Sequence, residues 1–222
     1  MRIANGKVEE IFLDGSARID CPPDLIPSPG QYLLAHAPAS DLPLPVPLFF
    51  ASTSPNGFRC APLSVKCQPA DEINIRGPIG HGFSIPASAK KIALIAYEES
   101  SARLQGLIPV ALKQNAEIVL LCDSQLKDVP EIIEVQPLQS LNDILKWADY
   151  SAIDIARENL NQLREMLGKQ DQVKNKYEAQ ILIHAPMPCG GVAECGVCAL
   201  TLSHKWKMIC KEGPVFELSE VL

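Results

Sequence analysis

Half of the eight cysteines of this chain lie within 22 residues near its C-terminal end, with the spacing C-x5-C-x2-C-x11-C. They are Cys189, Cys195, Cys198 and Cys210. Two thiols separated by two residues can hold one metal centre from a single turn, and a third can reach it from a preceding loop. The fourth follows a predicted hairpin, with strands at 199–202 and 206–209. Four thiolates in this arrangement suit either an iron–sulfur cluster or a zinc ion.

The residues around these cysteines favour iron–sulfur over zinc, although the spacing alone leaves zinc open. Small residues leave backbone N–H groups free to approach cluster sulfides, and they are Gly190, Gly191, Ala193, Gly196 and Ala199. A structural zinc site more often uses two C-x2–4-C pairs, and the second pair is absent here. A thioredoxin-like dithiol at Cys195 and Cys198 should open a helix, whereas an alternating strand pattern follows. Four buried, unreactive thiols are a further alternative that their density argues against.

The composition restricts the class of protein. The chain has 222 residues, of which 47% are hydrophobic, and a formal net charge of −6. Without a basic patch we expect no nucleic-acid partner. The longest apolar runs are strand-sized, far below the ~20 residues of a membrane span, so we expect no membrane insertion. The N-terminus has no apolar export segment, and we therefore expect a cytoplasmic protein.

Residues 1–88 are predicted to form a small antiparallel β-barrel. Short apolar runs alternate with Pro, Gly and Asp, which is typical of strands joined by turns. The expected strands are Lys7–Leu13, Gln31–Ala35, Leu48–Ala51, Phe58–Ala61 and Glu72–Ile75.

Residues 89–178 are predicted to form a Rossmann-like α/β domain with a parallel sheet, because apolar strands alternate with helical patterns. The expected strands are Lys91–Tyr97, Glu117–Cys122, Ile132–Val135 and Tyr150–Ile155, the last of which could instead extend a neighbouring helix. The expected helices are Ala102–Gln114, Leu141–Trp147 and Arg157–Leu167, and 168–177 is expected to be a loop. A strand at Ala179–His184 leads into the cysteine segment, so residues 179–222 form the third predicted unit.

The cysteine segment resembles the iron–sulfur module of the electron-transfer subunit of NAD-linked, two-subunit dihydroorotate dehydrogenases. Pro186, Met187, Cys189 and Gly190 match the start of the family pattern, and residues 212–216, Glu-Gly-Pro-Val-Phe, match its end. The first gap between cysteines is one residue longer than in the family. Upstream, residues 77–83 (GPIGHGF) and 29–32 (PGQY) resemble two further family motifs. The resemblance implies a ferredoxin-reductase-like fold and a [2Fe-2S] cluster on Cys189, Cys195, Cys198 and Cys210.

The chain departs from this family at both nucleotide sites. The family holds FAD with an Arg-Pro-x-Ser motif, and the corresponding residues 48–52 keep Ser52 but lack the Arg. A diphosphate without Arg or a helix N-terminus is poorly held, which argues against FAD. If FAD binds, the resemblance gives Ser52, Gly77 and Gly80 as its contacts, although the glycines could simply build the interdomain turn. After the first α/β strand, residues 97–102 contain no glycine and two carboxylates, so we expect no NAD there.

These observations predict an electron-transfer subunit without acid, base or nucleophile residues of its own. The resemblance implies a hetero-oligomer with a flavin-containing catalytic subunit, such as a dihydroorotate dehydrogenase-type partner of pyrimidine biosynthesis. The alternatives are a zinc-stabilised structural or regulatory binding protein and a full FAD/[2Fe-2S] reductase. Pro186, Met187, Pro188 and Val192 are expected to form an exposed apolar docking surface beside the cluster.

Overall fold

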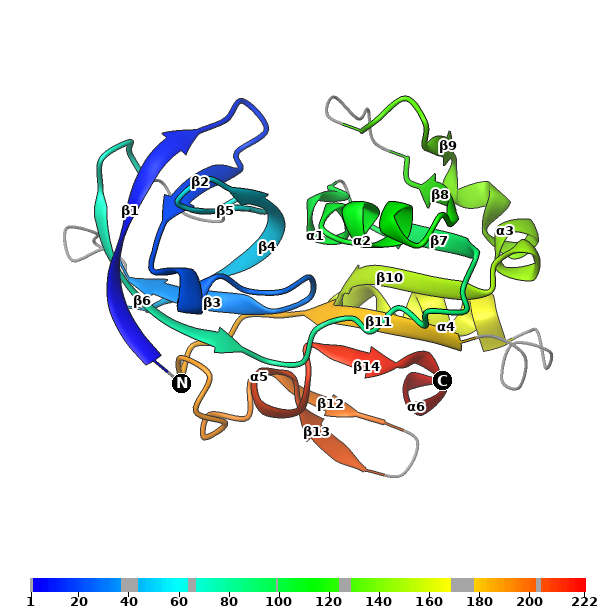
Figure 1. The fold of residues 1–222 in the computed structure, drawn as a ribbon. Helices are drawn as coiled ribbons and strands as arrows, with labels where there is room; N and C mark the ends of the chain where they lie inside the picture. Colours follow the sequence, from blue (N-terminus) through cyan, green and yellow to red (C-terminus); the bar gives the residue numbers. More distant parts are fainter. Residues whose placement is uncertain are drawn as a thin grey trace.

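The computed structural model describes residues 2–36, 44–63, 67–98, 100–123, 129–168, 178–202 and 205–222. These residues form a barrel, an α/β sheet with its helices, and a C-terminal hairpin region that lies beneath both (Figure 1). The largest buried apolar cluster joins all three parts, since it contains Tyr32 of the barrel, Ile153 of the sheet and Leu200 of the hairpin. The three parts therefore share one packed core.

The predicted N-terminal barrel is confirmed. Its strands are β1 (Arg2–Ile11), β2 (Ala17–Asp20), β3 (Tyr32–His36), β4 (Val46–Ser54), β5 (Gly57–Cys60) and β6 (Glu72–Ile79). They close in the order β1-β2-β5-β4-β3-β6 with antiparallel pairing, and a short 3₁₀ turn, η1 (Pro23–Leu25), follows β2. The sequence analysis missed β2, because four residues with two charges carry little of the alternating apolar pattern of a strand.

The predicted parallel sheet is also confirmed. Its strands are β7 (Lys91–Ala96), β8 (Glu117–Leu121), β9 (Glu134–Gln136), β10 (Tyr150–Ala156), β11 (Glu178–His184) and β14 (Val215–Glu217). The order is β14-β11-β10-β7-β8-β9, and only β14 runs antiparallel to its neighbour. The ambiguous segment at 150–155 is a strand with every residue buried, as expected of a central parallel strand.

The helices differ from the prediction at one place. The expected helix over 102–114 is two short helices, α1 (Ala102–Gln105) and α2 (Ile108–Lys113), separated at Gly106. A Cβ on Gly106 would lie 2.6 Å from the Phe50 ring, so this glycine lets the chain approach the barrel closely. Pro109 then stands in the first turn of α2, where a missing N–H is tolerated.

The other two predicted helices are found at the expected positions, as α3 (Leu141–Trp147) and as η3 (Arg157–Asn159) followed by α4 (Leu160–Gly168). A 3₁₀ turn that was not predicted, η2 (Leu138–Ser140), precedes α3. The loop expected at 168–177 lies, beyond Gly168, outside the described residues.

The C-terminal region contains the predicted hairpin, β12 (Ala199–Thr201) and β13 (Trp206–Met208), followed by α5 (Ile209–Glu212) and α6 (Leu218–Val221). Two of the six strands of the α/β sheet, β11 and β14, come from the last 45 residues. The division of the chain at residues 88 and 178 stays a prediction, since this sheet continues across the second boundary.

The GPIGHGF segment joins the barrel to the C-terminal region. The N–H of His81 donates to the Gly213 carbonyl at 2.8 Å, and Gln31 donates to the Gly80 carbonyl at 2.9 Å. Gly80 has φ +86°, and a Cβ there would lie 2.3 Å from Pro214. The glycine is therefore needed for the turn and for the close contact with residues 213–214.

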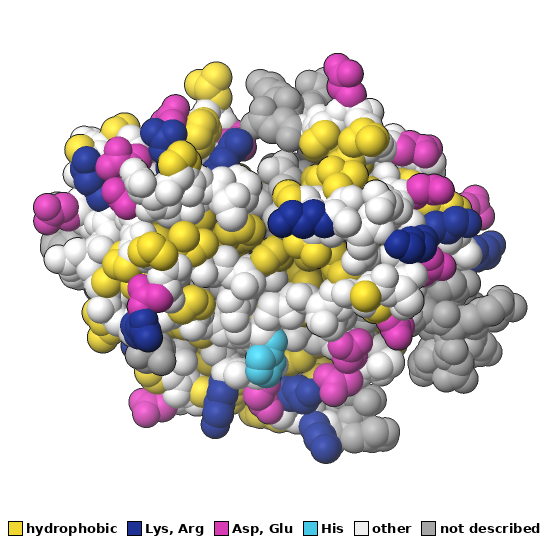
Figure 2. Space-filling model, in the orientation of Figure 1, with side chains coloured by type: hydrophobic (Ala, Val, Ile, Leu, Met, Phe, Trp, Pro, Cys, Tyr) yellow, Lys and Arg dark blue, Asp and Glu magenta, His cyan; other side chains and the backbone are white. Residues whose placement is uncertain are grey.

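Charged side chains of both signs are interspersed over the face seen in Figure 2, and no broad area of Lys and Arg is visible on it. None of the helices in the described ranges has the length and apolar character that a membrane span requires.

Candidate functional site

The four predicted cysteines lie in one region below the barrel. We call residues 185–198 the cysteine loop; it leaves the end of β11 and carries Cys189, Cys195 and Cys198. Met187 is buried, and its sulfur accepts a hydrogen bond from the hydroxyl of Tyr32 in β3 at 3.2 Å. This contact holds the start of the loop against the barrel.

Cys210 reaches the cysteine loop through the hairpin. Ala199 of β12 pairs with Met208 of β13, and the N–H of Ile209 donates to the Cys198 carbonyl at 3.1 Å. These contacts place the N-terminal residues of α5 beside the end of the loop, and they bring Cys210 to Cys198. The antiparallel hairpin thus brings together two cysteines that eleven residues separate in the sequence, as the predicted hairpin implied.

The thiols interact in two main pairs, Cys189 with Cys195 and Cys198 with Cys210, and an electrostatic interaction also links Cys189 to Cys210. Cys198 and Cys210 are buried, Cys189 is half-buried and Cys195 is exposed. Burial raises the pKa of the Cys210 thiol to about 12, and its hydrogen bond to Cys198 adds to the increase. One pair therefore lies in the core and the other at the surface.

Backbone N–H groups of the cysteine loop point at the thiols. Burial raises the pKa of Cys189, but N–H donors of Cys195, Glu194 and Val192, together with the Cys195 thiol, outweigh it and lower the pKa to about 6. The N–H of Ala193 donates to Cys210. Left-handed φ angles at Gly190, Gly191 and Ala193 turn the backbone so that these donors face inward. The loop therefore stabilises negative charge on sulfur.

The donor set fits an iron–sulfur cluster. Four thiols from one short segment face backbone N–H groups, which are the donors that tune cluster sulfides. Among the described residues, no group of three or more His, Cys, Asp and Glu side chains is positioned to hold a single metal ion.

The structure does not bring the three predicted flavin contacts, Ser52, Gly77 and Gly80, together around one cavity. Gly77 packs on Leu33, since a Cβ there would lie 2.6 Å from its side chain, and Gly80 packs on Pro214. Both glycines thus contact protein closely. Ser52 lies on β4 next to a bulge and does not line the cavity described next. A flavin role for these three residues stays a prediction.

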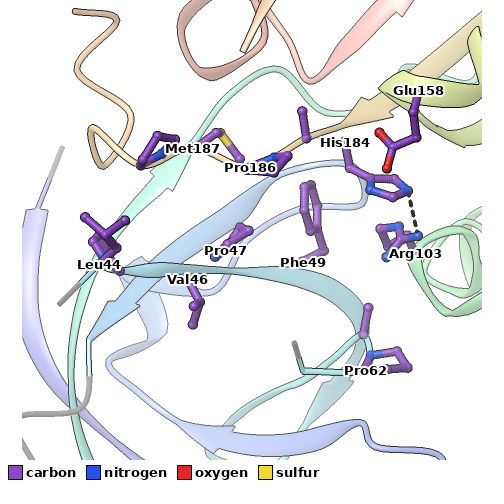
Figure 3. A pocket seen from close by; sticks show the side chains of 14 residues that line it. Leu44, Val46, Pro47, Phe49, Pro62, Arg103, Glu158, His184, Pro186 and Met187 are labelled. Carbon is purple, nitrogen blue, oxygen red and sulfur yellow. Dashed lines mark hydrogen bonds between the residues drawn. The ribbon is translucent and has the colours of Figure 1, made fainter. Parts of the chain in front are cut away.

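A cavity of about 440 Å³ opens where the barrel meets the α/β sheet (Figure 3). Its barrel wall is apolar, with Val46, Pro47 and Phe49 of β4, and the cysteine loop contributes Met187. Among the described residues that line it, Arg103 is the only Lys or Arg, and it is already paired with a carboxylate. The lining does not fit a flavin diphosphate, because it offers no unpaired cation to the phosphates.

Arg103, Asp154 and His184 form a buried polar cluster that the sequence analysis missed. The Nε of Arg103 donates to both carboxylate oxygens of Asp154, at 2.9 and 3.0 Å, and Asp154 is fully buried. Another guanidinium nitrogen donates to Nε2 of His184 at 3.0 Å, as drawn in Figure 3. Burial, with Arg103 beside it, lowers the pKa of His184. A lone carboxylate within the apolar strand SAIDIA was the signal for a cationic partner.

Glu98 extends this cluster along the turn that follows β7. It accepts hydrogen bonds from the Ala156 N–H at 3.0 Å and from the Asn159 side chain at 2.8 Å. Burial raises the pKa of Glu98, but these donors, with the nearby His184 and Arg103, outweigh it and lower the pKa. We call Glu98, Arg103, Asp154 and His184 the strand-edge cluster. Glu98 lies in the turn after β7, which is where dinucleotide-binding domains hold their phosphates; Glu99 is outside the described residues.

The expected docking surface needs one correction. Met187 is buried, with 3% of its surface exposed, because it packs under the barrel against Tyr32. Pro186 and Val192 are exposed, and Pro188 is half-buried. Val197 is a further exposed apolar side chain on the loop that the sequence analysis did not name.

Comparison with known proteins gives a match at this site. Residues 185–222 match the model of the iron–sulfur cluster binding domain of dihydroorotate dehydrogenase B. This range contains all four cysteines and begins at the first residue of the cysteine loop. The predicted iron–sulfur cofactor is thereby supported on the segment where the sequence placed it.

Two curated proteins are similar over most of the chain. Sulfhydrogenase 1 subunit gamma of Pyrococcus furiosus is 22% identical, over 87% of this chain and 80% of its own length. The electron transfer subunit of dihydroorotate dehydrogenase B (NAD(+)) of Desulforamulus reducens is 24% identical, over 70% of this chain and 67% of its own length.

A solved structure shares the fold. It is a chain of the NADH-dependent reduced ferredoxin–NADP oxidoreductase, studied for flavin-based electron bifurcation, with a TM-score of 0.74 and 17% identity. The match covers 98% of this chain and 89% of that chain. The ferredoxin-reductase-like fold expected from the order of the three parts is confirmed.

Proposed function

We propose that this chain, a divergent relative of the electron-transfer subunits of dihydroorotate dehydrogenase B, carries one [2Fe-2S] cluster and relays single electrons. Cys189, Cys195, Cys198 and Cys210 are the proposed ligands. The protein supplies ligation, inward-facing N–H donors and burial of one side of the cluster; the electron chemistry is that of the cluster. No residue of the described chain is assigned a role as acid, base or nucleophile.

The gathering of the four thiols in one region, on a segment that matches an iron–sulfur cluster binding domain, is the observation that carries this proposal. A [2Fe-2S] cluster has four cysteine ligands on two irons, so two thiols meet at each iron. The pairs Cys189–Cys195 and Cys198–Cys210 suit that division. A structural zinc ion would need all four thiols around one centre. The match to an iron–sulfur cluster binding domain supports the two-iron cluster over the zinc alternative.

The proposed partner is a catalytic flavoprotein subunit. The match to an electron transfer subunit implies a hetero-oligomer, and we propose a dihydroorotate dehydrogenase-type subunit of pyrimidine biosynthesis as that partner. A hydrogenase-type complex is the second candidate, favoured by the match to a sulfhydrogenase gamma subunit over a larger share of both chains. We also propose a cytoplasmic location, because cluster ligands must stay reduced until the cluster is assembled.

The exposed side of the cysteine loop is the proposed contact with this partner. Cys195 is exposed, and Val192 and Val197 beside it expose 47% and 40% of their surface. Apolar side chains around an exposed ligand allow a partner to approach while water is excluded. The buried pair, Cys198 and Cys210, faces the opposite way, toward the core.

The test is a quantitative analysis of the protein purified without oxygen. Iron, acid-labile sulfide, zinc and flavin are measured on one sample, together with the visible spectrum before and after dithionite and NADH. We expect equal iron and sulfide at two of each per chain, as a [2Fe-2S] cluster requires, no flavin, and bleaching by dithionite but not by NADH. One zinc without sulfide would refute electron transfer. Stoichiometric FAD would instead restore the reductase alternative.

A further inference from the structure

Arg76 lies against the cysteine loop from the barrel side. It belongs to β6 and is half-buried. A Cβ built on Gly190 would lie 3.1 Å from its Nη2 atom, and one built on Gly191 would lie 3.9 Å from it. Arg76 also lines, with Cys189 and Gly190, a cavity of about 360 Å³ between the barrel and the loop. The guanidinium thus contacts the backbone immediately after the first cysteine.

Within the described ranges, no ion pair to a carboxylate is found for Arg76, whereas three other arginines of the barrel and the α/β domain form one. Arg103 pairs with Asp154, Arg18 with Glu10, and Arg59 with Asp14. A half-buried guanidinium without an opposite charge loses hydration and gains nothing in return. Since none of the described carboxylates pairs with Arg76, the thiols of the adjacent cysteine loop are the anionic groups proposed to face it.

The thiolates of the proposed cluster ligands are the anionic groups that lie near Arg76. The buried hydroxyl of Tyr32 is influenced by both Arg76 and the thiols. Burial raises the pKa of Tyr32, and Cys210, Cys198 and Cys189 raise it further, whereas Arg76 lowers it. Arg76 and three of the proposed ligands therefore act on one buried atom. Arg76 and Cys189 line the same cavity, so a charge on this thiolate and the guanidinium can interact.

We infer that Arg76 raises the reduction potential of the cluster held by the cysteine loop. The inference rests on the proposed function and goes beyond it, since it assigns a tuning role to a barrel residue. Reduction adds one electron, and hence one negative charge, to a centre that already carries negative charge. A fixed cation close by stabilises the reduced form more than the oxidised form.

The experiment is an anaerobic redox titration of the cluster in the wild-type protein and in two variants. Arg76→Gln removes the charge at similar size, and Arg76→Lys retains it. At the midpoint potential of the wild type, we expect R76Q to show an about tenfold lower ratio of reduced to oxidised cluster, equivalent to about 59 mV for one electron. R76K should keep most of the wild-type ratio. Iron and sulfide contents should be equal in all three proteins.

Arg18→Gln is the matched control, because it removes one positive charge from the same barrel at an exposed ion pair. It should leave the potential unchanged, since exposed charges are screened by water and salt. An equal shift in R18Q and R76Q would attribute the effect to net charge and overturn the inference.

Three other results would also overturn it. A fully loaded R76Q with an unshifted potential would exclude tuning. An unshifted potential with weaker, salt-dependent reduction of a flavoprotein partner would assign Arg76 to docking an acidic surface. Loss of iron from R76Q but not from R76K would show that the charge of Arg76 stabilises the structure of the cysteine loop and does not tune the cluster. Absence of iron and sulfide from the wild type would refute the proposed function itself, and so differs from these three.

Discussion

The cysteine loop and the strand-edge cluster are adjacent in the chain and opposite in character. His184 ends β11 and belongs to the cluster, and the loop begins at the next residue. In the cluster, Arg103 satisfies both Asp154 and His184, while Glu98 accepts two hydrogen bonds from the protein. In the loop, N–H donors converge on sulfur with no cationic side chain of the loop itself.

This difference teaches how a shared fold can keep one binding site and close another. The charged groups of the strand edge neutralise each other, so a nucleotide phosphate would have to displace existing partners to bind there. The donors of the cysteine loop are arranged around atoms that gain negative charge when they ligate metal. The cysteine loop can thus still bind a metal centre, because within the described residues its N–H donors are not matched by anionic groups of the protein, whereas the charges of the strand-edge cluster already pair with each other.

The largest effect that separates the two regions should come from Cys198→Ser. This substitution removes a buried ligand and leaves Cys210 without its paired thiol. We expect iron and sulfide to fall below about a tenth of the wild-type content, because a four-cysteine cluster loses one of its ligands. The measurement is iron and sulfide analysis of the anaerobically purified protein.

Cys67→Ser is the control for this experiment. Cys67 is a half-exposed cysteine of the barrel region outside the four, and its replacement should leave iron and sulfide unchanged. If both variants kept full cluster content, Cys198 would not be a ligand. The comparison between the two regions would then lose its basis.

The next largest effect should be on stability and should come from Asp154→Asn. The change leaves the guanidinium of Arg103, whose side chain is 14% exposed, without its opposite charge. Breaking such a pair from one side should cost about 3 kcal/mol, which for a chain of this size lowers Tm by roughly 6–12 °C. Thermal melting followed by circular dichroism checks this, and cluster content should stay unchanged.

Asp24→Asn is the matched control, because Asp24 pairs with Arg2 at the surface. An exposed pair should contribute less than about 1 kcal/mol. Equal losses in the two variants would show that burial adds nothing to the strand-edge cluster. Loss of the cluster in D154N alone would show that the two regions are coupled and not independent.

The two regions also differ in how far the sequence predicts them. The cysteines were recognised because all four lie within one short segment and the hairpin between the third and fourth has an alternating pattern. The strand-edge cluster joins residues 51 and 81 positions apart, which no local pattern reveals. Arg103 in particular lies on a short helix whose sequence gives no sign of a buried partner.

The sequence predicted the elements that are long and apolar. It did not predict features that depend on close contacts between distant parts of the chain. The apolar strands β7 and β8 were predicted from their composition, whereas the fully buried strand β10 was left ambiguous between strand and helix. The break between α1 and α2 was not predicted, since it depends on the approach of Gly106 to Phe50 across the barrel boundary. Met187 was expected at the surface for a similar reason, because its buried contact is with Tyr32, 155 residues away.

A moderate effect on partner reduction should come from Val192→Glu. The side chain lies on the exposed part of the cysteine loop, so a charge there should weaken an apolar contact without touching the ligands. We expect the second-order rate of electron transfer to a dihydroorotate dehydrogenase B catalytic subunit to fall about tenfold, or about 1.4 kcal/mol. Stopped-flow measurement of flavin reduction provides the rate.

Leu13→Glu is the control, because Leu13 is a fully exposed apolar side chain of the barrel. It should leave this rate unchanged. Loss of iron from V192E would rule out a purely surface role for Val192, and equal rates in V192E and the wild type would place the contact elsewhere on the molecule.

The smallest effect should be a change in the pH dependence of stability in His184→Gln. The guanidinium of Arg103 can only donate, so Nε2 of His184 must accept and stay unprotonated. Burial and this neighbour lower the pKa of His184 from 6.5, although Asp154, Glu98 and Glu158 oppose them. As the pH falls through 6.5, the unfolded chain takes up a proton that the folded chain resists, and stability is lost.

In H184Q that loss should disappear, so Tm should fall less between about pH 7.5 and about pH 6 than in the wild type. Parallel melting curves at these two pH values test this directly. Equal slopes would show that the imidazole is not held neutral, and the strand-edge cluster would then be open to protonation in the way that the thiols of the cysteine loop are open to metal.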